Sequence, residues 1–418
     1  MAVKQITPAV PKPDHVPDAL VYDFDFHFDP DLLASGHKRI AEIVREAPPI
    51  FWTPRHGGHW ILRSHEAVYK AQRDPDNFSN SPFDYEQVKA MNEKLDDDHK
   101  LLLGLPITVD PPIHTIYRAP LNKTFSPKNV LALKDSIRQL AIELIEKVKP
   151  QGHCEFMSAI AEPLPVTIFL RMFGLPLERQ AEYRKLVDEH LRTPFQADDQ
   201  QDTMARQRKI AMVLRETILA RKAEPRDDII SMLWQTKIGG EQPTLHDIEN
   251  YCVILTVAGL DTVMNGMGLG VRHLAMNPDL QARLRADLSL VPEAAEELLR
   301  RYTFTVPPRF LKHDVEFEGV TMKQGEMALM FLPGADLDPD EFKAPDDYNL
   351  ARENKVHIAF GTGPHRCLGS HLARIELQVL YEEMLKALPE FRIDPDKPTV
   401  FHGGNVIGPD ELNLVWDV

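Results

Sequence analysis

The chain has 418 residues, and its 63 acidic side chains outnumber the 48 basic ones, which gives a net charge of −15. This acidity argues against nucleic-acid binding, which needs a basic surface. A hydrophobic content of 43% supports a sizeable core and excludes disordered and collagen-like classes. The three cysteines are too few and too scattered for a disulfide framework, which indicates a reduced, cytoplasmic setting. Since no apolar run is long enough to span a membrane, we expect a soluble protein. We also expect it to be a monomer.

Residues 1–20 read as an arm whose prolines would interrupt a helix. Helical periodicity dominates the rest of the chain, and the predicted helices cover 31–47, 64–73, 111–122, 127–148, 155–173, 178–192, 203–223, 244–276, 278–286, 292–302 and 369–387. Short strand-like runs stand at 51–52, 60–62, 309–312, 327–331 and 412–416. The connection 79–110 is long enough to be functional, and the polar stretch 194–201 is expected to be a hinge. The pattern predicts one mainly α domain over 1–418 with small β-sheets.

The longest predicted helix, 244–276, begins with a plausible capping pair, Thr244 and Asp247. Its middle is nearly all apolar, so it is expected to run through the centre of the protein. There it carries Ala258-Gly259-Leu260-Asp261-Thr262, whose glycine, acid and hydroxyl cost stability in a buried helix. One interpretation is a helix end or an exposed face. The other is an opening in the helix, where a ligand and a proton path need space and polar groups.

A glycine-rich loop near the C-terminus reads Phe360-Gly361-Thr362-Gly363-Pro364-His365-Arg366-Cys367-Leu368-Gly369 and leads directly into a helix. The N–H groups at a helix start favour a thiolate at Cys367. A lone cysteine is more often a buried, inert thiol, and that is what we expect of Cys154 and Cys252. For Cys367, the spacing F-G-x-G-x-H-x-C-x-G favours a functional thiolate.

Together with Ala258 to Thr262 and with Glu297-Leu298-Leu299-Arg300, this loop resembles the cytochrome P450 family over almost the whole chain. Within the family, the likeness is greatest to the bacterial camphor-hydroxylating group. The resemblance implies haem b, lying between the long central helix and the cysteine loop with its C-terminal helix. It implies that Cys367 ligates the iron and that Phe360 and Gly369 of the same loop also bind the haem. The haem propionates would be held by His114, Arg118, Arg309 and His365.

The resemblance also implies a haem-dependent monooxygenase, in which Thr262 and Asp261 serve oxygen binding and proton delivery. Glu297 and Arg300 would form a structural pair, because i and i+3 share one helix face. The substrate-contacting loop would be 79–110. The predicted substrate-binding residues share an apolar character and are Leu101, Leu102, Leu105, Val257, Ala258, Thr305, Val306 and Val406, several of which could equally be plain core residues.

Camphor-type relatives use a tyrosine hydroxyl in the loop before Asp110, whereas this sequence has Leu101-Leu102-Leu103 there and its only loop tyrosine, Tyr85, lies far upstream. This departure favours a terpenoid or norisoprenoid of the ionone type over camphor or another monoterpenoid. The resemblance further implies electrons from a 2Fe-2S ferredoxin with a separate reductase, docked near Arg73, Arg118 and Arg366. The rival hypotheses are a haem-binding sensor or carrier without oxygen chemistry and a peroxide-driven haem enzyme. Asp261 and Thr262 count against both.

Overall fold

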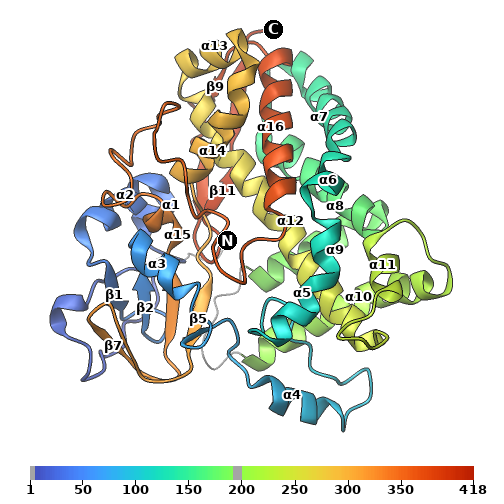
Figure 1. The fold of residues 1–418 in the computed structure, drawn as a ribbon. Coiled ribbons are helices and arrows are strands. Elements are labelled where there is room, and N and C mark those ends of the chain that lie inside the picture. Colours follow the sequence, from blue (N-terminus) through green and yellow to red (C-terminus); the bar gives the residue numbers. More distant parts are fainter. Residues whose placement is uncertain (1–4, 192–199) are drawn as a thin grey trace.

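The computed structural model describes residues 5–191 and 200–418, and its helices gather around one long central helix, α12 (Leu245–Ala275). Figure 1 shows α12 crossing the middle of the molecule, with the sheet-rich N-terminal part on one side and helices α5 to α11 on the other. The remaining helices are α1 (Pro30–Ser35), α2 (His37–Glu46), α3 (His65–Ala71), α4 (Tyr85–Asn92), α5 (Ile113–Thr124), α6 (Pro127–Leu131), α7 (Lys134–Val148), α8 (Pro163–Phe173), α9 (Gln180–Leu191), α10 (Gln200–Ala223), α11 (Ile229–Gln235), α13 (Pro278–Ala286), α14 (Val291–Arg301), α15 (Leu332–Ala335) and α16 (Ser370–Ala387). The prediction of a mainly α fold with small sheets is confirmed.

Four small sheets lie among the described residues. The largest has the order β1-β2-β8-β5-β3 and is antiparallel except where β2 runs parallel to β8. Its strands are β1 (Ile50–Thr53), β2 (His59–Leu62), β3 (Phe78–Ser79), β5 (Pro308–Leu311) and β8 (Met327–Met330). The others pair β4 (His153–Glu155) and β9 (Phe391–Ile393) with β12 (Asn413–Trp416), β6 (Val315–Phe317) with β7 (Val320–Met322), and β10 (Val400–His402) with β11 (Gly408–Glu411).

The central helix forms because a capping box and an apolar sequence act together. The Thr244 hydroxyl accepts the Asp247 N–H at 3.2 Å while the Asp247 carboxylate accepts the Thr244 N–H at 2.8 Å, as predicted. Core clusters formed with α7, α8, α14 and α16 pack along its length. This helix is long and apolar enough to cross a membrane, but 67% of its most apolar window is buried inside the protein, which is how the core helix of a globular fold looks.

Some predicted boundaries were wrong. The helix predicted over 31–47 is broken at Gly36, whose φ of +50° lies in the left-handed region that suits glycine. The helix predicted over 127–148 is divided into α6 and α7, and the one over 155–173 begins with β4 and a π-helical turn, Met157–Ala161. The connection 79–110 contains α4, which the sequence did not reveal. The predicted hinge at 194–201 lies outside the described residues as far as 199 and within α10 after that.

Candidate active site

The cysteine loop is a tight turn that precedes α16. The Cys367 N–H donates to the Phe360 carbonyl at 2.8 Å, which closes the loop, and Gly361 and Gly363 adopt φ of +66° and +69°. A Cβ at Gly363 would lie 2.4 Å from the Gln72 carbonyl oxygen, so this position has no room for a side chain. The Gln72 side chain also accepts the Thr362 N–H at 2.8 Å. The loop is therefore held against the end of α3.

The Cys367 side chain has accessible surface although it lies deep within the protein. Burial raises the pKa of this thiol, while the Gly369 N–H and the charges of Arg118, Arg366 and Arg374 oppose the rise. The other two cysteines differ, because both are buried, and burial raises the pKa of Cys154 to about 12. Cys154 and Cys252 are ordinary core thiols, as predicted. Of the three cysteines, only Cys367 combines accessible surface with nearby cations. Nearby positive charges stabilise the thiolate form that binds metals.

Three predicted anion-binding residues meet beside this loop. The rings of His114 and His365 lie 4.2 Å apart between centroids. Among the described residues, the Nδ1 atoms of both imidazoles are buried without a hydrogen-bond partner, whereas His365 Nε2 lies 3.6 Å from Asp110 Oδ1. Arg309 is 4% exposed, donates to the Pro308 carbonyl at 2.8 Å and forms no ion pair with a described residue. Burial lowers the pKa of Arg309 to about 10 and that of His114 to about 3. A buried guanidinium without a carboxylate partner suits an anionic ligand.

Asp110 orders the same region from the start of α5. Its carboxylate accepts hydrogen bonds from the Ser79 hydroxyl at 2.5 Å and the Asn80 N–H at 3.0 Å, and pairs with Lys312 at 2.9 Å. Burial favours the neutral acid, but the nearby His365 ring and these hydrogen bonds outweigh burial and hold the pKa of Asp110 well below its usual range. The fourth predicted contact, Arg118, is half-buried and donates to the Arg366 carbonyl at 2.6 Å.

The middle of α12 is continuous, which corrects the expectation of an opening in the helix. A Cβ on Gly259 would lie 2.4 Å from the Phe169 ring of α8, so this glycine permits close helix packing and leaves no ligand space. Ala258 is the accessible residue, although Leu255, Thr256 and Val257 directly before it are buried. The Thr262 hydroxyl is also partly accessible and donates to the Ala258 carbonyl at 3.1 Å. Ala258 and Thr262 therefore face the side where a ligand can lie.

Asp261 is 4% exposed and is held by Arg184 of α9. The Arg184 guanidinium donates to Asp261 Oδ1 at 3.1 Å, to the Leu260 carbonyl at 2.6 Å, and pairs with Asp188 at 3.0 Å. The Asn265 amide lies 3.3 Å from Asp261 Oδ2. Sequence reasoning missed Arg184, and its only local signal was the i,i+4 spacing to Asp188.

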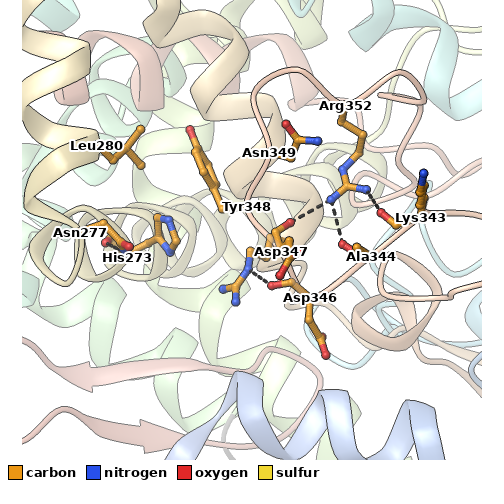
Figure 2. A pocket seen from close by; sticks show the side chains of 11 residues that line it. His273, Asn277, Leu280, Lys343, Ala344, Asp346, Asp347, Tyr348, Asn349 and Arg352 are labelled. Atoms are coloured by element: carbon orange, nitrogen blue, oxygen red, sulfur yellow. Dashed lines mark hydrogen bonds between the residues drawn. The ribbon is translucent and has the colours of Figure 1, made fainter.

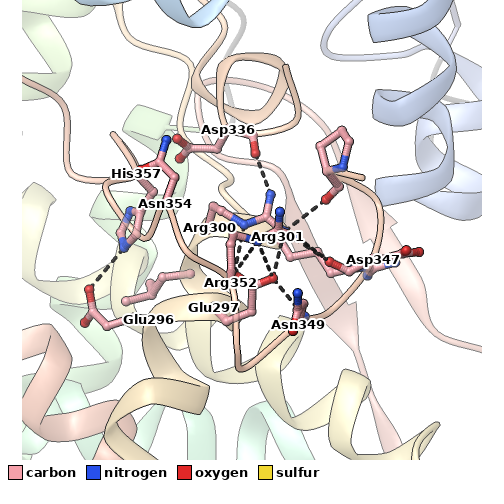
Figure 3. Close-up of polar contacts among 12 residues, drawn as sticks. Glu296, Glu297, Arg300, Arg301, Asp336, Asp347, Asn349, Arg352, Asn354 and His357 are labelled. Atoms are coloured by element: carbon pink, nitrogen blue, oxygen red, sulfur yellow. Dashed lines mark hydrogen bonds and ion pairs between the residues drawn. The ribbon is translucent and has the colours of Figure 1, made fainter. Parts of the chain in front are cut away.

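The predicted pair of Glu297 and Arg300 is present and includes a third member. Arg300 donates to both Glu297 oxygens at 2.9 Å, and Arg352 Nε lies 3.1 and 3.2 Å from the same oxygens. Figure 3 shows the two guanidinium groups converging on Glu297 from α14 and from the segment that precedes the cysteine loop. Arg300 also donates to the Asp336 carbonyl at 2.7 Å. This cluster fastens the loop region to α14 and carries no chemistry of its own.

The predicted substrate residues fall into different environments. Leu102 and Val257 share one core cluster with Phe169, whereas Leu105 belongs to another cluster with Val109. Thr305 and Val406 form an isolated antiparallel bridge and are half-buried. Val306 is fully buried in the core beneath β2 and β8, and Leu102, Leu105 and Val257 are only 1%, 3% and 7% exposed, so these four predicted substrate residues have little or no open surface in the structure. Leu101 is half-buried.

A polar pocket of about 490 Å³ lies near the Glu297 cluster, between the ends of α12 and α13 and the segment 343–352. Figure 2 shows the Arg352 guanidinium donating to the backbone carbonyls of Lys343, Ala344 and Asp347 at one side of this pocket. None of its lining residues is a predicted site residue. A larger pocket, about 1030 Å³, is lined by the start of 79–110, the N-terminal arm and Asp110. Neither pocket is lined by Cys367 or Thr262.

Glu376 of α16 is a further buried acid, which the sequence did not single out. It is 1% exposed, and neither of its oxygens has a hydrogen-bond partner among the described residues. Burial raises the pKa of Glu376 to about 8, so it is largely protonated at neutral pH.

Comparison with known proteins decides the family. The family model for cytochrome P450 matches residues 106–410. The chain belongs to the cytochrome P450 family. A probable cytochrome P450 127A1 from Sinorhizobium fredii is 33% identical over 97% of this chain and 97% of the relative. A steroid C26-monooxygenase from Mycolicibacterium smegmatis is 30% identical over 91% of this chain and 93% of the relative. The crystal structure of CYP101J2 matches at a TM-score of 0.84 with 33% identity and covers 98% of this chain and 100% of that one.

Membership of the cytochrome P450 family makes haem b the cofactor and the chain a monooxygenase. The described residues fit this cofactor. Cys367 supplies an accessible thiol. The unpartnered Nδ1 atoms of His114 and His365 and the guanidinium of Arg309, which forms no ion pair with a described residue, suit two propionates. Ala258 is an exposed position of α12 with a small side chain. The residues that bring these groups together come from α5, β5, α12 and the cysteine loop, which explains why local sequence patterns identified them only through the family motifs.

Proposed function

We propose that this monooxygenase hydroxylates a compact, apolar terpenoid or norisoprenoid of the ionone type in the cytoplasm. Haem b bound through Cys367 supplies the oxygen activation, and the chain's own residues bind the substrate and manage protons. The observation that carries the substrate class is the leucine-rich segment 101–105, which packs near α12 without offering a side-chain hydroxyl or charge. An apolar lining holds a ligand by shape and by area removed from water.

The absence of a tyrosine anchor in this segment supports an apolar substrate. Tyr85, the only tyrosine between 79 and 110, packs with Leu103, Leu105 and Tyr117. The Tyr117 hydroxyl in turn donates to Asp247 at 2.8 Å. Tyr85 is therefore part of the packing between α4 and α5, and a ketone bound near Ala258 would lack a phenol from this loop.

Thr262 and Asp261 are proposed to carry protons. The Thr262 hydroxyl is accessible and donates a hydrogen bond to the Ala258 carbonyl. Rotation of the hydroxyl would let it donate to a bound ligand instead. The Asp261 carboxylate is buried behind it and is kept in place by Arg184 and Asn265. Arg184 stays protonated, so its role is to orient the Asp261 carboxylate while it also pairs with the more exposed Asp188. The Asp261 carboxylate itself can accept a proton and pass it on to a neighbouring hydroxyl.

Electrons are proposed to come from a 2Fe-2S ferredoxin served by a separate reductase, and the enzyme is proposed to act as a monomer. Arg73 and Arg366 are exposed beside the cysteine loop, with Arg118 half-buried behind them. Such a local basic patch can steer an acidic partner even on a chain of net charge −15.

The test is a titration of the purified holoenzyme with β-ionone, camphor and a steroid, read by the haem absorption shift on water displacement. A steroid is included because one relative is named a steroid monooxygenase. We expect the tightest binding and a single main hydroxylated product with β-ionone, formed from NADH only when ferredoxin and reductase are present. Tight, fully coupled oxidation of camphor or the steroid instead would overturn the substrate class. Product formed from peroxide alone would overturn the electron partner.

A further inference from the structure

The first turns of α12 hold the leucine-rich segment through one buried side chain, Asn250. This residue is fully buried, and its Oδ1 accepts the N–H groups of Leu103 at 2.8 Å and Gly104 at 3.1 Å. Its amide nitrogen donates to the His246 carbonyl at 2.9 Å and lies 3.1 Å from His246 Nε2. Both oxygen lone pairs and both N–H groups of the carboxamide can therefore be satisfied here. A buried amide with all its bonds made holds its partners in one place.

The face of α12 that holds this segment is joined to the reactive residues by the rigid helix. Asn250, Ile254, Ala258 and Thr262 follow one another at intervals of four residues, and each is turned by about 40° from the one before, so Thr262 lies about 120° around the helix axis from Asn250. Gly104 comes close to this face, because a Cβ there would lie 3.6 Å from Ile254 Cβ. Twelve residues separate Asn250 from Thr262, which is ~18 Å along a rigid helix. Asn250 thus ties the position of Leu103 and Gly104 to that of Thr262.

A second set of hydrogen bonds between α12 and the loop involves the neighbouring residue, Glu249, whose carboxylate is fully buried. It accepts hydrogen bonds from Arg215 Nε at 2.6 Å and from Arg208 at 3.3 Å, both on α10. The same two arginines extend to the segment before the leucines, where Arg208 donates to the Lys100 carbonyl and Arg215 to the Asp98 carboxylate. The loop, α10 and α12 are therefore joined at adjacent positions of one helix.

At the other end of the segment, Asn92 of α4 brackets Leu101. The Leu101 N–H donates to Asn92 Oδ1 at 2.7 Å, and the Asn92 amide donates to the Leu101 carbonyl at 3.0 Å. Asn92 also lies 3.3 Å from the His246 Nε2 that faces Asn250. Residues 101–104 are thus hydrogen-bonded to two asparagines, Asn92 and Asn250, whose amide groups both lie close to His246 Nε2.

We propose that Asn250 is a positioning residue that sets the leucine segment over the substrate and thereby determines which carbon of the substrate is hydroxylated. The inference rests on the proposed function, in which this segment contacts the substrate. The helix itself does not depend on Asn250, because α12 packs against α8, α9, α10, α14 and α16 along its length. Loss of the acceptor would instead leave two buried N–H groups unpaired, and the segment would move until water satisfies them.

The test compares Asn250→Leu, which removes the acceptor, with Asn250→Asp, which keeps an acceptor oxygen in place. The matched control is Asn277→Leu. The Asn277 amide makes the same kind of bond to the carbonyl four residues back, His273 at 2.7 Å, but lies just beyond the other end of α12. All variants are prepared as holoenzymes and must show the thiolate-specific absorption of the carbon-monoxide complex.

We expect Asn250→Leu to bind β-ionone about tenfold more weakly, equivalent to ~1.4 kcal/mol, and to give a mixture of hydroxylated regioisomers. Asn250→Asp should restore most of the wild-type product ratio, and Asn277→Leu should match the wild type. An unchanged product ratio in Asn250→Leu, or an equal change in Asn277→Leu, would overturn the proposal.

Hydrogen exchange separates a failure of this inference from a failure of the substrate proposal. The Leu103 and Gly104 amides should be protected in the wild type and lose protection in Asn250→Leu, while the rest of α12 stays protected. If β-ionone does not bind the wild type, the substrate class is wrong, and the product-ratio test is repeated with the ligand that does bind. If the two amides stay protected in Asn250→Leu, the positioning role is wrong whatever the substrate.

Discussion

Replacement of Glu297 by glutamine should destabilise the protein by removing the charge shared by two buried arginines. Arg300 and Arg352 are 1% and 6% exposed, and both donate to the Glu297 carboxylate. Breaking a buried ion pair from one side typically costs ~3–5 kcal/mol, because the remaining charge stays desolvated. We expect the lower end, ~3 kcal/mol, since the carbonyls of Asp336 and Lys343 continue to accept from the two guanidinium groups.

This cost converts into a modest shift of the unfolding midpoint. The unfolding entropy of ~2.1 cal/mol/K per residue amounts to ~0.9 kcal/mol/K for 418 residues, so ~3 kcal/mol lowers Tm by ~3–4 °C. Because Arg352 lies in the segment that leads to the cysteine loop, part of the carbon-monoxide complex should also lose its thiolate-specific absorption. The assay is thermal unfolding of the holoenzyme followed by circular dichroism, together with the carbon-monoxide difference spectrum.

The matched control is Glu293→Gln, one turn earlier on α14. Glu293 pairs with Lys355 at 3.5 Å, but the two side chains are 54% and 46% exposed. Exposed pairs contribute less than ~1 kcal/mol, so Tm should fall by at most ~1 °C. Equal shifts for the two variants, or a Glu297→Gln protein with wild-type Tm and spectrum, would refute the argument that burial gives the cluster its strength.

Three further predictions concern the relay, acid stability and substrate fit. Thr262→Ala should retain substrate binding but divert NADH electrons to peroxide, and Asp261→Asn should slow turnover because an amide carries no proton; unchanged coupling and rate in both would contradict the relay. Burial lowers the pKa of His59 in the folded protein to about 3, whereas in the unfolded chain it is ~6.5. Between these two values only the unfolded chain binds the proton. The free energy of unfolding is therefore highest above pH ~6.5 and decreases as the pH falls toward 3. His59→Leu should therefore recover ~2 kcal/mol at pH 5, measured as a smaller fall in Tm between pH 7 and 5, and an unchanged fall would count against it. Leu102→Tyr should improve camphor binding and weaken β-ionone binding through overpacking, as two titrations would reveal, and opposite trends would contradict an apolar fit at this segment.

Local patterns in the sequence were sufficient for features whose parts are close together in the chain. The glycines and the thiol of the cysteine loop lie within ten consecutive residues, 360–369, which the structure folds into one turn, and α16 follows directly from Ser370. The capping box of α12 and the Glu297–Arg300 pair are also local, since each joins residues three apart. Such features are determined by backbone geometry and short-range hydrogen bonds, which a single sequence contains.

Only the tertiary structure decided how distant segments complete these features. Gly259 was expected to make room for a ligand, but the Phe169 ring of α8 occupies its bare face, and Ala258 is the accessible residue instead. Arg184 reaches Asp261 across 77 residues, and Asn250 reaches Leu103 across 147. No periodicity or spacing encodes such contacts, because they depend on how helices pack once their apolar faces are buried. The sequence alone therefore led to the prediction of which residues form the reaction centre, whereas packing decided which side chains surround them.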